Sequence, residues 1–123
     1  MKINTKATNI SLTPAISEYI EKKLESLVKF FSNTDEVIIN VEVGKSTKHH
    51  KSGEYFRAEL HVISAGEDYY VAAQKDDLYA AIDEVKDGII REMTSRRKRT
   101  IRLVRKGGAR IKAILKNLNP WKS

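Results

Sequence analysis

The chain has 123 residues, 41% of them hydrophobic, a net charge of +7 and no cysteine. This length suits one domain with a modest core, and the lack of cysteine excludes a disulfide framework and thiolate chemistry. The N-terminus lacks the apolar run of a signal peptide, and no apolar stretch reaches the roughly 20 residues that cross a bilayer. We therefore expect a soluble, cytoplasmic protein.

The first predicted elements are a strand and an amphipathic helix. Residues 2–8 alternate in polarity, as a strand does. Thr13 and Pro14 suit a helix start, because Thr caps free N–H groups and Pro at the first helical position gives up no hydrogen bond. An apolar stripe at helical spacing predicts that this helix runs to about Phe31. The stripe consists of Ile16, Ile20, Leu24, Leu27 and Phe31.

Three strands are predicted next. Residues 37–43 and 55–62 alternate apolar and polar side chains, and a polar, basic connection at 44–53 separates them. Residues 65–68 are expected to form a hairpin turn before the last strand, at 69–74. The strict alternation indicates that one face of the sheet is buried while the other faces water.

A second amphipathic helix follows the strands. Asp76 and Asp77 are better explained as caps of its free amides than as a carboxylate pair for acid–base chemistry. The helix leads into the basic run 96–99, and cations suit a helix C-terminus, so it is expected to continue past Arg99. Its apolar stripe consists of Leu78, Ile82, Val85, Ile89 and Met93.

The C-terminal segment shows different features. Gly107 and Gly108 are expected to end the second helix. Beyond them, residues 111–118 have the spacing of a short basic amphipathic helix, which at under about 12 residues would be marginal without a partner.

The order of these elements predicts an α+β fold. Runs of adjacent strands imply a four-stranded, mostly antiparallel sheet, and both helices must bury their stripes on its one apolar face, giving a two-layer sandwich. A helix joins the first two strands, so those strands are expected to be parallel. We assign residues 1–99 to this domain and residues 100–123 to a basic extension that is hypothesised to order only on RNA.

Charge is unevenly distributed between these two parts. The last 30 residues, 94–123, hold 11 of the 23 Lys and Arg residues and none of the 16 Asp and Glu residues. They therefore carry +11, and the preceding residues carry −4. Such a one-sided basic end indicates a binder of polyanions, because a solubilising tail or a solvated helix face usually mixes the two signs.

The sequence offers little that could support catalysis or metal binding. His49, His50 and His61 lack metal-ligand spacing with acidic partners. Gly107 and Gly108 lack the Gly-Lys-Ser/Thr ending of a phosphate loop. No serine or threonine lies in a nucleophile motif. We therefore expect no enzymatic activity, no catalytic residue, no bound metal and no cofactor.

Two segments carry a resemblance to a known family. They are Ile3-Asn4-Thr5-Lys6 with Leu12-Thr13-Pro14-Ala15-Ile16, and Asp77-Leu78-Tyr79-Ala80-Ala81-Ile82-Asp83. With the order of elements, they resemble the ribosome hibernation-promoting factor and ribosome-associated inhibitor A family, in its short, sigma-54 modulation protein-like form. The resemblance covers roughly residues 1–99, and the basic tail departs from the family's usual neutral or acidic one.

The resemblance implies a function and a set of contacts. Members of this family bind the small ribosomal subunit over the decoding region, overlap the sites of messenger and transfer RNA, and preserve inactive ribosomes under stress. A monomer that contacts 16S ribosomal RNA and neighbouring ribosomal proteins, and no membrane, is expected. The resemblance points to Lys22, Lys23, Lys29, Lys86, Arg91, Arg96, Arg97, Lys98 and Arg99 as RNA-binding residues, and the charge of the tail adds Arg102, Arg105 and Lys106.

The mode of RNA recognition and the alternatives also follow from the sequence. The fold resembles double-stranded-RNA-binding domains, which favours contacts to phosphates and ribose hydroxyls over base stacking. Tyr55 and either Tyr69 or Tyr70 are the candidates for exposed stacking aromatics. The alternatives are a general RNA-binding protein or RNA chaperone, a basic ribosomal protein, and a module that docks its tail helix on a protein or an anionic membrane.

Overall fold

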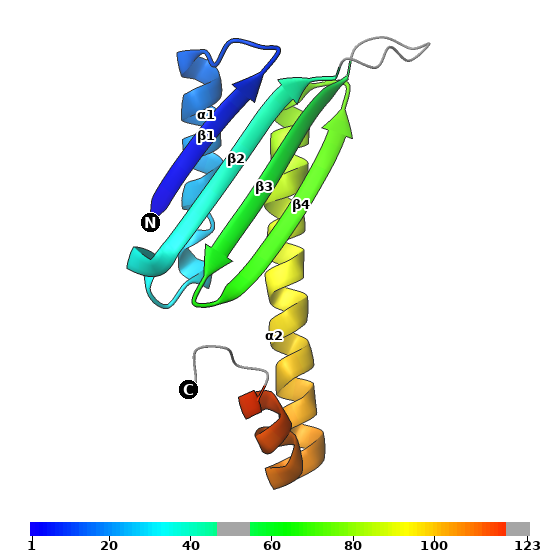
Figure 1. Cartoon of the computed structure of the whole chain (residues 1–123). Coiled ribbons are helices and arrows are strands. Elements are labelled where there is room, and N and C mark those ends of the chain that lie inside the picture. The colour runs from blue at the N-terminus through cyan, green and yellow to red at the C-terminus, as the bar shows by residue number, and fades with distance from the viewer. Residues whose placement is uncertain (47–54, 118–123) are drawn as a thin grey trace.

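One four-stranded sheet and two helices make up the structure, a computed structural model (Figure 1). It describes residues 1–46 and 55–117, with side chains described only as far as residue 105. Both helices lie on the same face of the sheet, so the predicted two-layer α+β sandwich is confirmed. The elements are β1 (Lys2–Thr8), α1 (Pro14–Glu25), β2 (Val37–Lys45), β3 (Phe56–Ser64), β4 (Glu67–Lys75) and α2 (Leu78–Asn117), with 3-10 turns at Val28–Phe30 and Thr34–Glu36.

The strands lie in the sheet in their chain order. β1 pairs with β2 in parallel, with Lys2 opposite Ile38, and α1 makes the crossover between them. The other two pairings are antiparallel. The turn between β3 and β4 is shorter than predicted and consists of Ala65 and Gly66, with φ of 47° and 81°. Two left-handed residues at this point match the twist of a hairpin, and the position of Gly66 favours glycine.

The core lies between the sheet and the two helices. Alternate residues of the strands point into it, as predicted from their polarity pattern, and Ile39, Val43 and Val62 are fully buried. The predicted stripe of α2 is buried along its whole length, from Leu78 to Met93. No side chain among the buried residues of the described chain is polar or charged, so hydrophobic burial holds these layers together.

The first helix is shorter than predicted. α1 ends at Glu25, and the chain continues through Leu27 into the 3-10 turn Val28–Phe30. The hydroxyl of Ser26 donates a hydrogen bond of 2.5 Å to the backbone oxygen of Lys23, and such local bonds compete with continued helix formation. Leu27 is nevertheless fully buried, because the tighter turn still directs it to the core.

The second helix is longer than predicted, and the prediction that Gly107 and Gly108 end it is wrong. Helical backbone continues to Asn117, so residues 111–117 belong to α2, and Leu118 lies outside the described residues. Each glycine costs only about 1 kcal/mol in a helix, and the residues on both sides of the pair form helices well. The ribbon changes direction within its orange-to-red part (Figure 1). The prediction that this helix continues past Arg99 is confirmed.

Candidate nucleic-acid interface

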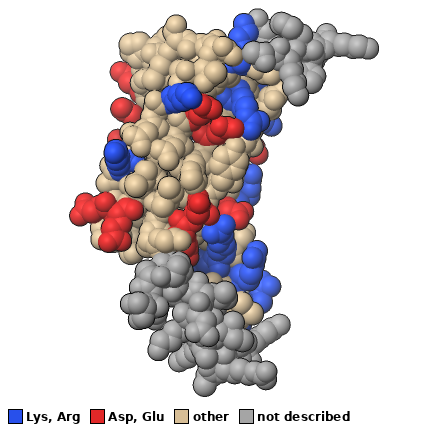
Figure 2. Space-filling view, viewed as in Figure 1, with Lys and Arg blue, Asp and Glu red and all other residues tan. Residues whose placement is uncertain are grey.

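The second half of α2 extends beyond the sheet and carries a run of cations. Met93 is the last buried residue of the helix, and every side chain from Arg97 to Arg105 is exposed. Figure 1 shows the yellow and orange part of α2 passing beyond the ends of the strands. In Figure 2 blue side chains gather at this end of the described surface. The charges of this segment are therefore open to a partner.

Most of the predicted RNA-binding cations are exposed and unneutralised. Within the described residues, seven of them form no ion pair with a carboxylate, so their charges are free to attract phosphate. For Lys106 the structure describes only the helical backbone. The seven are Lys22, Lys29, Arg97, Lys98, Arg99, Arg102 and Arg105.

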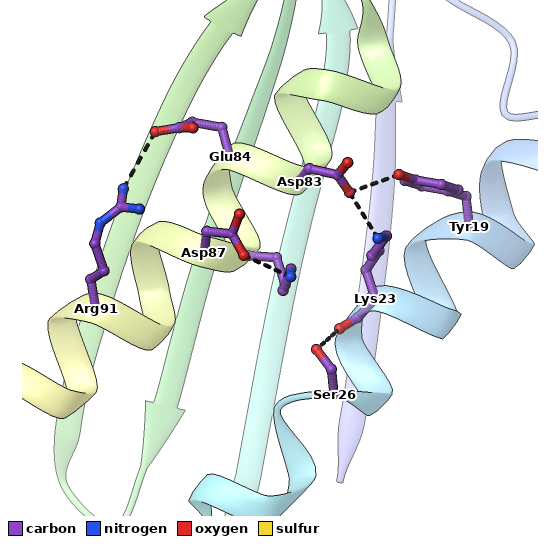
Figure 3. A network of polar contacts seen from close by, with 8 residues as sticks. Tyr19, Lys23, Ser26, Asp83, Glu84, Asp87 and Arg91 are labelled. Carbon is purple, nitrogen blue, oxygen red and sulfur yellow. Dashed lines mark hydrogen bonds and ion pairs between the residues drawn. The ribbon is translucent and has the colours of Figure 1, made fainter.

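Four other predicted contact residues are engaged within the protein. Lys86 lies 2.6 Å from Asp87, and Arg91 lies 3.3 Å from Glu84 (Figure 3). The Arg96 Nε atom lies 3.6 Å from Glu92, one turn earlier on α2. The fourth is Lys23, which pairs across to α2. A phosphate that approaches any of them must compete with a carboxylate, which makes these four weaker candidates than the seven free cations.

A direct contact joins the cations that follow α1 to those of α2. The Arg97 side chain donates a hydrogen bond of 3.3 Å to the backbone oxygen of Phe30, 67 residues earlier in the chain. This contact places the exposed Lys29 beside the start of the free part of α2. Of the cations predicted on the first helix, Lys29 therefore lies near the point where α2 leaves the sheet.

A polar cluster holds α1 against α2 (Figure 3). Tyr19 donates a hydrogen bond of 2.7 Å to Asp83, and Lys23 lies 3.2 Å from the same carboxylate oxygen. The bond to Asp83 raises the pKa of the Tyr19 hydroxyl and is also the main cause of the raised pKa of Lys23. The Tyr79 ring packs edge-on against the Tyr19 ring, with the centroids 4.8 Å apart. We assign these residues to positioning the two helices.

Arg96 lies over an aromatic ring. Its guanidinium carbon lies 4.3 Å from the centre of the Tyr69 ring, within the range of a cation–π contact. Tyr69 is only 5% exposed, so it is not the free stacking aromatic that the sequence allowed. Burial, followed by a hydrogen bond to Glu67, raises the pKa of Tyr69 to about 12.

The open face of the sheet has a different character. It carries charges of both signs, many of them paired, and Figure 2 shows red and blue side chains mixed over it. Arg57 lies 2.8 Å from Glu59, and this contact, followed by a hydrogen bond from Tyr70, lowers the pKa of the Glu59 carboxyl. Tyr70 is 57% exposed, and of the sequence's aromatic candidates it is the most open. A face this mixed is poorly suited to a polyanion.

The described residues contain no group of three or more His, Asp or Glu side chains placed to hold a metal ion. His61 pairs with Asp68 on the open face of the sheet, while His49 and His50 lie outside the described residues. None of the helices described is both long enough and apolar enough to span a membrane.

Sequence reasoning missed the contacts that tie the two helices and the turn after α1 together. The pairing of Asp83 with Tyr19 and Lys23, and the bond from Arg97 to Phe30, join residues that lie far apart in the sequence. A charged residue beside the apolar stripe of each helix is the one available signal, and it is weak, because solvated helix faces carry such residues too.

Comparison with known proteins gives a consistent result. The family described as Sigma 54 modulation protein / S30EA ribosomal protein matches residues 3–101. Ribosome hibernation promoting factor of Escherichia coli (strain K12) is 32% identical over 94 residues, which are 76% of this chain and 90% of that protein. The factor of the same name from Azotobacter vinelandii is 29% identical over 103 residues, covering 82% of this chain and 87% of that one.

Solved structures agree with these sequence matches. The crystal structure of the Thermus thermophilus Protein Y N-terminal domain superposes with a TM-score of 0.65 at 31% identity, covering 76% of this chain and 96% of that chain. A ribosomal subunit interface protein from Coxiella burnetii has a TM-score of 0.62 at 20% identity, covering 80% of this chain and 99% of that one, and supports the fold alone.

Proposed function

Because this chain belongs to the Sigma 54 modulation protein / S30EA ribosomal protein family, we propose that it is a ribosome hibernation factor. It binds the small ribosomal subunit in the cytoplasm as a monomer, contacts 16S ribosomal RNA in the cleft where messenger and transfer RNA lie, and blocks translation by occupancy. Ribosomes held in this way are preserved under stress. No catalytic step and no cofactor is required, since the bound protein itself is the obstacle.

The observation that carries this proposal is the exposed, unneutralised row of cations on α2. Arg97, Lys98, Arg99, Arg102 and Arg105 follow one another on a helix that extends beyond the sheet, and in the described chain none of them pairs with a carboxylate. Release of counterions from the RNA drives such binding, so affinity falls steeply as salt rises. Contacts of this kind position a protein on RNA without reading its sequence.

The compact domain supplies the specificity that free cations lack. The sheet and the Tyr19–Asp83 contact fix the distance and angle between the two helices. Lys22 and Lys29 therefore hold fixed positions relative to the cations of α2. A rigid pattern of charges can match the shape of one folded RNA better than another, which supports a preference for the ribosome over bulk RNA.

The test is sedimentation of the purified protein with purified small and large subunits at near-physiological salt. We expect co-migration with the small subunit and inhibition of a cell-free translation reaction by the same preparation. A general RNA-binding protein or RNA chaperone would bind bulk RNA and small subunits with equal affinity. Failure to co-migrate, or unchanged translation, would contradict the proposal.

A further inference from the structure

A pocket of about 320 Å³ lies where α2 leaves the sheet. Its walls come from three parts of the chain that are distant in sequence. Phe30 and Phe31 follow α1, Ala65 belongs to the turn between β3 and β4, and Arg96 and Arg97 belong to α2. Its volume falls at the lower end of pockets that hold small ligands. The pocket adjoins the row of cations described above.

The two arginines of this pocket differ in what they can offer a ligand. Arg97 is exposed, and its one hydrogen bond within the described residues goes to the backbone oxygen of Phe30, so no carboxylate there neutralises its charge. Arg96 lies over the ring of Tyr69 and near Glu92. The Tyr69 ring and the Glu92 carboxylate thus hold its guanidinium in place, and a planar group can stack on an arginine guanidinium. Arg97 is therefore suited to bind an anion, and Arg96 is suited to stack on a planar ring of a ligand.

We propose that this pocket holds one unstacked nucleotide of the RNA that α2 contacts. Its phosphate binds Arg97, and its base lies against the guanidinium of Arg96 and the apolar wall of the pocket. Proteins commonly recognise unpaired RNA bases by stacking them on aromatic side chains or arginine planes. This inference rests on the proposed function for the source of the RNA, but the pocket itself can be tested without ribosomes.

Glu67 gives the bound nucleotide its orientation. It is the one carboxylate on the described wall of the pocket, and it accepts a hydrogen bond from the Tyr69 hydroxyl. A carboxylate repels a phosphate and accepts hydrogen bonds from the N–H groups of a base. The phosphate therefore lies toward Arg97, and the edge of the base lies toward Glu67. Guanine, with two kinds of N–H donor on one edge, makes GMP the suitable probe.

The experiment is a titration of the isotopically labelled full chain with GMP, followed by the backbone amide signals in NMR spectra. We expect saturable shifts at Phe31, Ala65 and Tyr69. Replacing Arg97 with Gln should weaken binding about tenfold, as expected for the loss of one charge-assisted contact. Inorganic phosphate and guanosine, which each supply half of the ligand, should bind more weakly than GMP.

Lys75→Gln is the matched control, because it likewise removes one positive charge, from an exposed position of β4 outside the pocket and outside the row of cations on α2. It should leave GMP affinity nearly unchanged. Equal weakening by both variants, inorganic phosphate binding as well as GMP, or unshifted pocket amides would each overturn the proposal. Any of these results is compatible with intact ribosome binding, so failure of the pocket is distinguishable from failure of the proposed function.

Discussion

The hydroxyl of Tyr19 in α1 bonds to the carboxylate of Asp83 in α2 at 2.7 Å, across 64 residues of sequence. This bond, the ion pair of Lys23 with the same carboxylate and the contact between the Tyr19 and Tyr79 rings link the two helices directly. The relative position of the two sets of cations therefore depends on a small polar cluster at the protein surface.

Tyr19→Phe removes the hydroxyl and keeps the ring. We expect a loss of about 1 kcal/mol in the free energy of unfolding, the typical net value of one hydrogen bond. Urea unfolding would measure it. Tyr79→Phe is the control, since the Tyr79 hydroxyl makes no hydrogen bond within the described residues. Equal effects of the two changes would contradict a special role for the Tyr19–Asp83 bond.

Gly88 allows α2 to approach β4 closely. A Cβ atom at this position would lie 2.7 Å from the Cγ1 atom of Val71. Gly88→Ala should therefore destabilise the protein by about 1–3 kcal/mol, because the overlap forces side chain or backbone to shift. In a Val71→Ala background the same change should become stabilising by about 0.5–1 kcal/mol, since Ala favours a helix over Gly. Thermal or urea unfolding of the unaltered protein, the two single variants and the double variant would show whether the effect of Gly88→Ala on the free energy of unfolding changes sign.

The exposed cations of α2 should control the salt dependence of ribosome binding. Changing Lys98, Arg99 and Arg102 to Gln should reduce the slope of log affinity against log salt by about one for every phosphate that the variant no longer neutralises. Binding assays on small subunits at several salt concentrations would measure it. The control changes Lys2, Lys6 and Lys75, which are exposed on strands, and lowers the net charge equally. An equal reduction of the slope in the control would mean that net charge alone decides binding.

The part of α2 beyond Thr100 should contribute to binding but little to folding. Residues 101–105 are exposed, and the buried core ends at Met93. Ending the chain at Thr100 should change the free energy of unfolding by less than about 0.5 kcal/mol, as surface changes usually do. The truncated protein should bind small subunits more weakly and with a flatter salt dependence. Unchanged affinity and slope would show that the basic extension does not touch RNA.

Tyr69 should make stability depend on alkaline pH. Its pKa is about 12 in the folded protein, chiefly because it is buried, and about 10 in an unfolded chain. The folded state thus holds this proton more tightly, so the contribution to stability is full below pH 10 and falls as the pH rises toward 12. The folding equilibrium constant should drop by up to about tenfold per pH unit in this window relative to Tyr69→Phe. Identical pH profiles of the two proteins would contradict this assignment.

The sheet and the core could be predicted from the sequence because local patterns determine them. Alternating polarity located β2 and β3, and the stripe from Leu78 to Met93 located the buried face of α2. The end of α1 could not be predicted, because the apolar stripe continues past it and Leu27 stays buried although the α-helix ends at Glu25. The end of α2 was predicted wrongly at Gly107 and Gly108. The free-energy cost of two glycines in a helix is small, and the residues around them favour helix strongly enough to offset it.

The candidate site could be predicted only in part. Composition identified the cations, but it could not separate Arg91, which faces Glu84, from Arg99, which faces solvent. The pocket beside Tyr69 was not foreseen, because its walls come from three distant segments. Such groupings depend on tertiary contacts, which no local pattern contains.

The parallel pairing of β1 with β2 has a consequence for how the chain folds. Lys2 lies opposite Ile38, so β1 can pair only with a strand that begins at Val37, much later in the sequence. α1 can form meanwhile from contacts within its own turns, whereas β1 gains its ladder only after a loop of more than thirty residues has closed. We therefore expect β1 to join the sheet late in folding, after the three antiparallel strands that follow it have paired with one another.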